Sequence, residues 1–167
     1  MYILIGVKAP WNVDQQLCFA LYASSRALVR AYDPLLAPLG ITYPQYLVML
    51  VLWEEDGRTV NGIGEKLDLD SGTLTSLLKR LEARGLVTRK RDATDERVVR
   101  VSLTKEGLAL RPKASAILKD VACEVGITLA EAVALRETLH GISRRLAERA
   151  SAAKIPPTKN PKRSSPR

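Results

Sequence analysis

The chain has 167 residues, 46% of them hydrophobic and 26% charged, a composition typical of one soluble globular domain with a real core. No run approaches the roughly 18 apolar residues of a membrane span, and the opening MYILIGVK lacks the basic region and apolar length of a signal peptide. Two cysteines about a hundred positions apart exclude a small disulfide-framed domain and lack metal-ligand spacing. We therefore expect a cytoplasmic protein with reduced thiols and no metal or cofactor.

The net charge of +8 is unevenly distributed. Residues 151–167 hold five Lys/Arg and no acidic residue, and their Pro, Ser and Lys content cannot build a core, so they are interpreted as a disordered basic tail. Residues 79–100 hold eight Lys/Arg against four Asp/Glu, whereas the rest of the chain is slightly acidic. The basic charge of the folded part is thus confined to one stretch, as a nucleic-acid-binding face requires.

The first two expected elements are helices. Apolar residues from 17 to 35 keep the spacing of one helical face, and prolines and a glycine between 34 and 40 close this long helix. Thr42 can cap a second helix that runs through QYLVMLVLWEE to Asp56-Gly57. That helix is almost wholly apolar, so we expect it at the centre of the core.

Two short helices and a hairpin follow. The segments VNGIGEKLDL and DSGTLTSLLKRLEARG, the latter starting at Asp70 or Ser71 and ending at Gly85, predict a helix-turn-helix. The strand-like LVTRKR and RVVRVSL on either side of DATDE predict a β-hairpin with a five-residue tip. A helix-turn-helix followed by a hairpin indicates a winged helix.

Two more helices are expected after the hairpin. Thr104 with Gly107 opens the first, which Pro112 should kink, and Thr128 with Glu131 forms a capping box for a last helix that ends near Ala150.

The predicted fold class is therefore mainly α with a small β-hairpin, a winged helix-turn-helix. Its terminal helices carry apolar faces without a partner in their own domain, so we expect dimerisation through the N- and C-terminal helices. The predicted parts are an N-terminal extension at 1–11, a winged-helix domain at 12–150, with its DNA-binding part at 58–103 and dimerisation helices at 12–37 and 104–150, and a basic tail at 151–167.

The second helix of the helix-turn-helix offers short hydroxyls and cations on one face, which suit close approach to bases and phosphates, while its leucines pack inward. A plain surface helix would look similar, but the adjoining wing argues for DNA. Arg89, Lys90 and Arg91 lead into the wing and either meet phosphates or solvate an exposed strand. The DNA-contact candidates on the helix are Ser71, Thr73, Thr75, Ser76, Lys79 and Arg80.

The first helix carries a candidate redox thiol. At about 100° per residue, Cys18, Tyr22, Ser25, Val29 and Tyr32 share one narrow stripe, so the thiol faces tyrosines or something packed on them. The thiolate is the reactive form of cysteine, and hydrogen-bond donors such as tyrosine hydroxyls stabilise it. Because Cys18 lies one to two turns inside its helix, we give the tyrosines more weight than the helix dipole. The alternative is an ordinary buried cysteine among core aromatics.

The order of elements and the stretch LDSGTLTSLLKRLEARGLVTRKRDATDERVVRVSLTKEG resemble the MarR family of bacterial regulators. Within it, QLCFALYASSRALVRAY and GITYPQYLVMLVLWE resemble the organic-hydroperoxide-sensing OhrR branch. The resemblance covers residues 12–150 and implies a homodimeric repressor that binds double-stranded DNA at an inverted-repeat operator. It further implies that organic hydroperoxides oxidise Cys18 and release the operator.

The resemblance also implies residue roles. Tyr32 and Tyr43 would reach Cys18 across the dimer interface, and Cys123 resembles the resolving thiol of the two-cysteine type. At the hairpin tip, Arg97 would enter the minor groove while Asp95 holds it.

Two other functions remain open: a MarR-type regulator that responds to a small aromatic ligand, and a thiol peroxidase. We expect no enzyme, because a peroxidase would leave residues 60–103 without a role. His140, alone on the last helix, is interpreted as an ordinary surface or core histidine.

Overall fold

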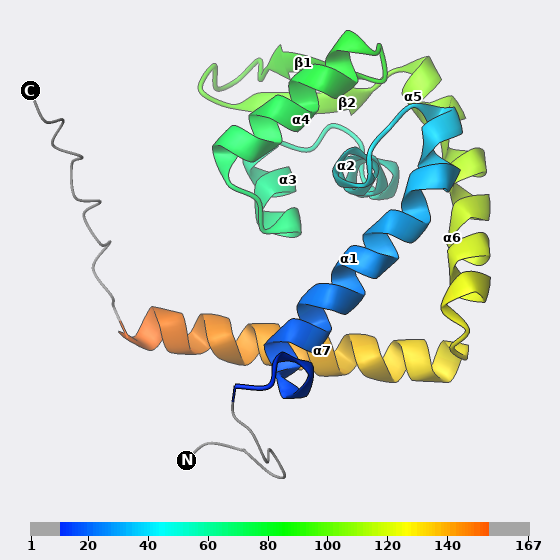
Figure 1. Cartoon of the computed structure of the whole chain (residues 1–167). Helices are drawn as coiled ribbons and strands as arrows, with labels where there is room; N and C mark the ends of the chain where they lie inside the picture. Colours follow the sequence, from blue (N-terminus) through cyan, green and yellow to red (C-terminus); the bar gives the residue numbers. More distant parts are fainter. Residues whose placement is uncertain (1–10, 154–167) are drawn as a thin grey trace, which may run out of the picture. The chain divides into compact units, whose positions relative to one another are not determined.

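The structure is a computed structural model that describes residues 11–153. The chain divides into two compact units, one ending at Val125 and one beginning at Gly126, and each is described by itself. Within the described range the elements are η1 (Val13–Gln15), α1 (Leu17–Leu36), η2 (Ala37–Leu39), α2 (Tyr43–Glu54), α3 (Val60–Leu67), α4 (Ser71–Ala83), β1 (Val87–Arg91), β2 (Val99–Leu103), α5 (Lys105–Ala109), α6 (Arg111–Val125) and α7 (Leu129–Ala153), as Figure 1 shows.

The long first helix is α1, which contains Pro34 and is followed by the 3-10 turn η2. The turn closes at Gly40, whose φ of +64° lies in the left-handed region that glycine adopts without strain. Only the C-terminal end of α1 is buried, at Tyr32 and Leu36, whereas Leu17 at its start is 64% exposed. Within its own compact unit, the N-terminal apolar surface of α1 is therefore left uncovered.

The central helix of the core is α2, as the sequence predicts. Thr42 and Gln45 form a capping box, in which the Gln45 side-chain oxygen accepts the N–H of Thr42 at 2.9 Å. Most side chains of α2 are buried, Tyr46, Met49 and Leu52 among them. This helix supplies the apolar surface on which the helix-turn-helix and the wing are assembled.

The predicted helix-turn-helix is formed by α3 and α4. Asp68 ends α3 with a φ of +52°, a left-handed conformation that aspartate tolerates. Asp70 caps α4 by accepting the N–H of Thr73 at 2.9 Å, and Gly85, with a φ of +69°, follows the end of α4. The buried face of α4 consists of Leu74, Leu77, Leu78 and Leu81, as predicted.

The wing is the antiparallel pair β1–β2, in which Arg91 lies opposite Val99 at the tip end. Thr59, just before α3, forms an isolated antiparallel β-bridge with Arg100 of β2. The loop between the strands covers 92–98, which is longer than the predicted tip, because the N–H of its last residue bonds within the loop rather than across the ladder. The predicted winged helix-turn-helix is confirmed.

The helix predicted after the wing is two helices, α5 and α6. Thr104 accepts the N–H of Gly107 at 3.0 Å and caps α5, as predicted, but α5 ends at Ala109. A new helix begins at Arg111 with Pro112 in its first turn. The predicted kink at this proline is therefore wrong. Proline lacks a backbone N–H, but N–H groups in the first turn of a helix have no partner within the helix, so Pro112 is accommodated at the start of α6 without bending it.

The second unit contains α7, which has the predicted capping box. Thr128 donates its N–H to Glu131 at 2.8 Å, and its hydroxyl accepts the N–H of Glu131 at 3.2 Å. The helix continues to Ala153, past the predicted end near Ala150. The rest of the predicted basic tail lies outside the described residues. Residues 1–10 of the predicted N-terminal extension also lie outside them. The exposed large apolar side chains of α7 are Leu129, Val133, Leu135 and Leu146.

Among the described helices, none is by itself long and apolar enough to cross a membrane, although the bent pair of 17–39 and Tyr43–Glu54, meeting at 73°, passes that test on length and composition alone.

Candidate functional site

The outer face of α4 carries the predicted DNA-contact side chains. Five of the six are exposed on the side opposite the buried leucines, and Asp70 holds the start of this face in place: the Thr73 hydroxyl donates to Asp70 Oδ2 at 2.6 Å. The hydrogen bonds from Thr73 keep the pKa of the Asp70 carboxyl below its usual range. The exposed side chains are Ser71, Thr73, Ser76, Lys79 and Arg80.

Thr75 departs from this pattern. It is half-buried rather than exposed, because it lies one turn before Leu78 on the side of α4 that faces the wing. There it forms part of the wall of a pocket whose volume is about 320 Å³. The prediction that Thr75 belongs to the exposed row is wrong.

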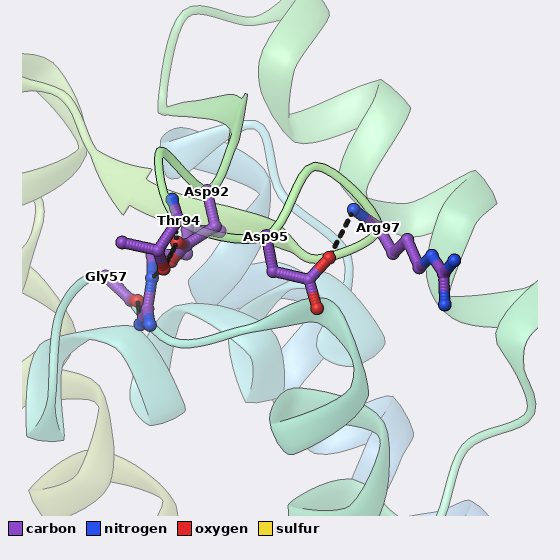
Figure 2. Close-up of polar contacts among 6 residues, drawn as sticks. Gly57, Asp92, Thr94, Asp95 and Arg97 are labelled. Atoms are coloured by element: carbon purple, nitrogen blue, oxygen red, sulfur yellow. Dashed lines mark hydrogen bonds and ion pairs between the residues drawn. The ribbon is translucent and has the colours of Figure 1, made fainter.

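The tip of the wing is shaped by Asp95 and presents Arg97. The Arg97 backbone N–H donates to Asp95 Oδ1 at 3.0 Å, whereas the guanidinium extends away from that carboxylate, as Figure 2 shows. Asp95 thus holds Arg97 by its backbone and fixes the turn, and the entry of the guanidinium into the minor groove stays a prediction. Arg97 is exposed and makes no ion pair with any residue in the range 11–153.

Sequence reasoning missed the anchor of the wing. Asp92 accepts hydrogen bonds from the Thr94 N–H at 2.9 Å, from the Thr94 hydroxyl at 2.6 Å and from Arg100 Nε, and Arg100 Nη1 donates to the Gly57 carbonyl at 3.1 Å (Figure 2). The Thr94 and Arg100 hydrogen bonds hold the pKa of Asp92 well below its usual range. The signal in the sequence was a pair of opposite charges flanking the tip.

Arg89 is not free to meet a phosphate. Its guanidinium donates to Glu82 at 2.9 and 2.5 Å, and this pair ties β1 to α4. The Arg89 hydrogen bonds lower the pKa of the Glu82 carboxyl. Lys90 and Arg91 are exposed along the strand, so a phosphate contact for Arg91 stays a prediction.

The candidate thiol lies at the start of α1. Cys18 is the second residue of the helix and is exposed, because residues 13–15 form a separate 3-10 turn and Gln16 is extended, with φ −88° and ψ 122°. The expectation that Cys18 lies one to two turns inside the helix is therefore wrong. First-turn N–H groups have no partner within the helix and give its start a partial positive charge, which favours an anion there.

The tyrosines gather at the other end of α1. Tyr32 and Tyr43 lie with ring centroids 4.8 Å apart, and Tyr46 lies 5.7 Å from Tyr32. Burial raises the pKa of Tyr32 and of Tyr43, and burial together with the neighbouring tyrosines raises the pKa of Tyr46 to about 12. These phenols therefore stay protonated at neutral pH and can act as hydrogen-bond donors.

Within one chain the thiol and this tyrosine cluster are far apart. Cys18 and Tyr32 lie on the same helix with a separation of fourteen positions, which corresponds to roughly 21 Å along the axis. The nearest tyrosine along the helix is Tyr22, one turn on, whose hydroxyl accepts a hydrogen bond from Arg26 at 2.8 Å. A contact between Cys18 and Tyr32 or Tyr43 thus requires a second copy of the chain.

The second thiol, Cys123, lies near the end of α6 and is also exposed. Its predicted role as the resolving thiol stays a prediction. His140 is exposed on α7, as an ordinary surface histidine would be.

Three comparisons with known proteins agree with this architecture. A family model for the transcriptional regulator SarA/Rot matches residues 30–111. The HTH-type transcriptional regulator TtmR of Methylorubrum extorquens is 50% identical over 151 residues, which is 90% of this chain and 77% of the relative. The organic hydroperoxide resistance transcriptional regulator of Bacillus subtilis is 58% identical over 103 residues, covering 62% of this chain and 70% of the relative.

Solved structures extend the match to DNA-bound and oxidised states of one relative, AbfR of Staphylococcus epidermidis. Reduced AbfR bound to DNA is 38% identical and covers 81% of this chain and 94% of that chain, with a TM-score of 0.68. Disulfide-formed AbfR is 38% identical and covers 78% and 91%, with a TM-score of 0.59. From its winged helix, its sequence identities and these folds, the chain belongs to the MarR family of transcriptional regulators, in the organic-hydroperoxide OhrR branch.

Proposed function

We propose that this chain is a homodimeric, cytoplasmic DNA-binding repressor that senses organic hydroperoxides through Cys18 and then releases its operator. The observation that carries the proposal is the position of Cys18: an exposed thiol in the first turn of α1, on a chain whose relatives include an organic hydroperoxide regulator. The DNA-binding face and the thiol lie on different elements, so an oxidation at one can alter the other through the helices between them.

DNA binding is supported by the exposed row on α4 and by the wing arginine. A helix of this kind enters the major groove, and an arginine at a wing tip suits the narrower minor groove. A two-fold dimer presents two such sets, so the operator is an inverted repeat with half-sites about 10 base pairs apart.

Dimerisation is supported by the uncovered apolar surfaces, since large apolar groups in a stable protein are normally covered by a partner. Those on α1 and on α7 belong to the predicted dimerisation helices. A second copy would also bring its tyrosine pair, the buried Tyr32 and the half-buried Tyr43, to the thiol that one chain leaves without them.

The chemistry of sensing is a two-electron oxidation. The Cys18 thiolate attacks the terminal oxygen of the hydroperoxide; the O–O bond breaks, a sulfenic acid forms, and the alkoxide leaves and takes a proton to become an alcohol. The sulfenic acid then condenses with the thiol of Cys123 of the other subunit, which forms an intersubunit disulfide and releases water. Because a disulfide needs Cα atoms within about 7 Å, its formation can force helices to move and shift the two winged helices out of register with the DNA grooves.

The test is a gel shift of an operator duplex with the wild-type protein and with Cys18→Ser, each with and without cumene hydroperoxide. We expect the wild type to release DNA on oxidation and the variant to stay bound. Release of Cys18→Ser by the peroxide would contradict the thiol sensor. Release of both proteins by an aromatic acid, with no response to peroxide, would favour a ligand-responsive regulator, and multiple turnovers of peroxide per thiol would favour a peroxidase.

A further inference from the structure

A pocket of about 320 Å³ lies between the start of α3, the half-buried side of α4 and the tip end of the wing. Asn61 contributes from α3, Thr75 from α4 and Arg97 from the wing, over an apolar floor that includes Leu78 and Val99. None of the lining residues carries a carboxylate. The pocket is therefore suited to an anion.

Three polar groups that line the pocket make no hydrogen bond to any residue between 11 and 153: the Asn61 amide, the Thr75 hydroxyl and the Arg97 guanidinium. The other polar groups of the lining are engaged elsewhere. The Thr59 hydroxyl accepts the N–H of Gly62 at 3.0 Å as the cap of α3, and Arg89 is paired with Glu82. Donors from three separate elements thus remain for a ligand at one place.

The position of the pocket indicates which ligand that is. If α4 occupies the major groove and Arg97 the adjoining minor groove, one sugar-phosphate strand must run between them, since that strand separates the two grooves. The same two elements form two walls of the pocket, so this strand passes its opening. We infer that the pocket binds one backbone phosphodiester of the operator in each half-site, with the Asn61 amide as a donor to the phosphate oxygen, an assignment that rests on the proposed DNA-binding function.

The inferred contact has an energetic signature that separates it from an arginine contact. An amide that donates to a charged oxygen strengthens binding about tenfold, yet it displaces no counterion because it carries no charge. Asn61→Ala should thus lower the affinity about tenfold while leaving the slope of log K against log salt unchanged. The loss should be equal on operator and on unrelated duplex DNA, because phosphates carry no sequence information.

A second variant protects the test against a loss of folding. Asn61 is the second residue of α3, where a negative side chain is favoured by the helix dipole, so Asn61→Asp should keep or raise the unfolding midpoint. The same carboxylate would repel a phosphate. We expect DNA affinity to fall further than in Asn61→Ala while the folded state is at least as stable, and no general damage to the fold produces that combination.

The decisive experiment is phosphate ethylation interference on an operator duplex, first mapped by footprinting with the reduced wild-type dimer. We expect one phosphate per half-site, between the contacts of α4 and the wing, whose ethylation weakens the wild type but not Asn61→Ala. The control is Lys66→Ala, which removes a cation on the same helix that is paired with Glu54 at 3.2 Å; it should give the wild-type pattern. An Asn61→Ala protein with wild-type affinity and pattern would overturn the phosphate assignment alone, whereas a wild-type protein that binds no duplex would overturn the proposed function itself.

Discussion

Arg89 is joined to Glu82 by three hydrogen bonds, one from its backbone N–H at 3.1 Å and two from its guanidinium at 2.9 and 2.5 Å. The contact links the first strand of the wing to the last turns of α4. Because both side chains are partly exposed, the pair is worth about 1 kcal/mol rather than the larger value of a buried pair.

The Glu82–Arg89 pair predicts a pH dependence of stability. The Arg89 hydrogen bonds lower the pKa of Glu82 below its ordinary 4.5 in the folded state, so the stabilisation is present above that value and is lost as the pH falls through the folded-state pKa. Glu82→Gln should therefore lower the free energy of unfolding by about 1 kcal/mol at pH 7, measured by urea titration, and by almost nothing at strongly acid pH. The control is Glu96→Gln in the exposed wing tip; an equal loss in both variants would contradict a specific pair.

Arg97→Ala should weaken operator binding by about tenfold or more while the dimer and the oxidation of Cys18 are unaffected, because the guanidinium makes no hydrogen bond or ion pair within residues 11–153. Fluorescence anisotropy gives the dissociation constant and sedimentation gives the oligomeric state. An unchanged dissociation constant would remove Arg97 from the interface.

Lys79→Ala should lower the affinity for all sequences and reduce the magnitude of the salt slope by about one, because an exposed lysine on α4 that meets a phosphate releases one counterion on binding. The measurement is the dissociation constant at several salt concentrations. A slope identical to that of the wild type would show that this side chain is only solvated.

Tyr32→Phe and Tyr43→Phe should each slow the oxidation of Cys18 by cumene hydroperoxide, since each removes a phenol proposed to donate to the thiolate of the other subunit. The rate is followed by mass spectrometry of the sulfenic acid trapped with dimedone. Tyr46→Phe is the matched control: its hydroxyl is buried without a hydrogen-bond partner in the described part, so its loss should leave the rate unchanged and stability equal or higher. Equal slowing in all three variants would point to damaged packing.

Cys123→Ser should still release DNA on oxidation but give no covalent dimer on a non-reducing gel, because its thiol is the proposed partner of the Cys18 sulfenic acid. The sulfenic acid would then persist and oxidise further to the sulfinic form, which mass spectrometry detects as two added oxygens. A covalent dimer that still forms in this variant would exclude Cys123 as the resolving thiol and leave the sensor assignment intact.

The order of elements, their caps and their buried faces could be predicted from the sequence. Thr42 with Gln45, Asp70, Thr104 and Thr128 satisfy N–H groups three or fewer positions away, and the leucines of α4 repeat with the helical period. These signals are local, so a single stretch of chain contains both the group and its partner.

The sequence does not show which polar groups remain free, because this depends on how distant elements pack together. Arg89 and Arg91 look alike in the sequence, yet the guanidinium of Arg89 is paired with Glu82 on α4. Thr75 and Ser76 are both short hydroxyl residues, yet Thr75 is half-buried towards the wing and Ser76 is exposed. Because Gln16 is extended, α1 begins at Leu17 and Cys18 lies in its first turn. The spacing of residues along a helical face does not show where the helix begins. The partner of Arg89, the burial of Thr75 and the position of Cys18 each depend on a residue distant in the chain or on one backbone angle. The pattern of residue types along the chain does not contain this information.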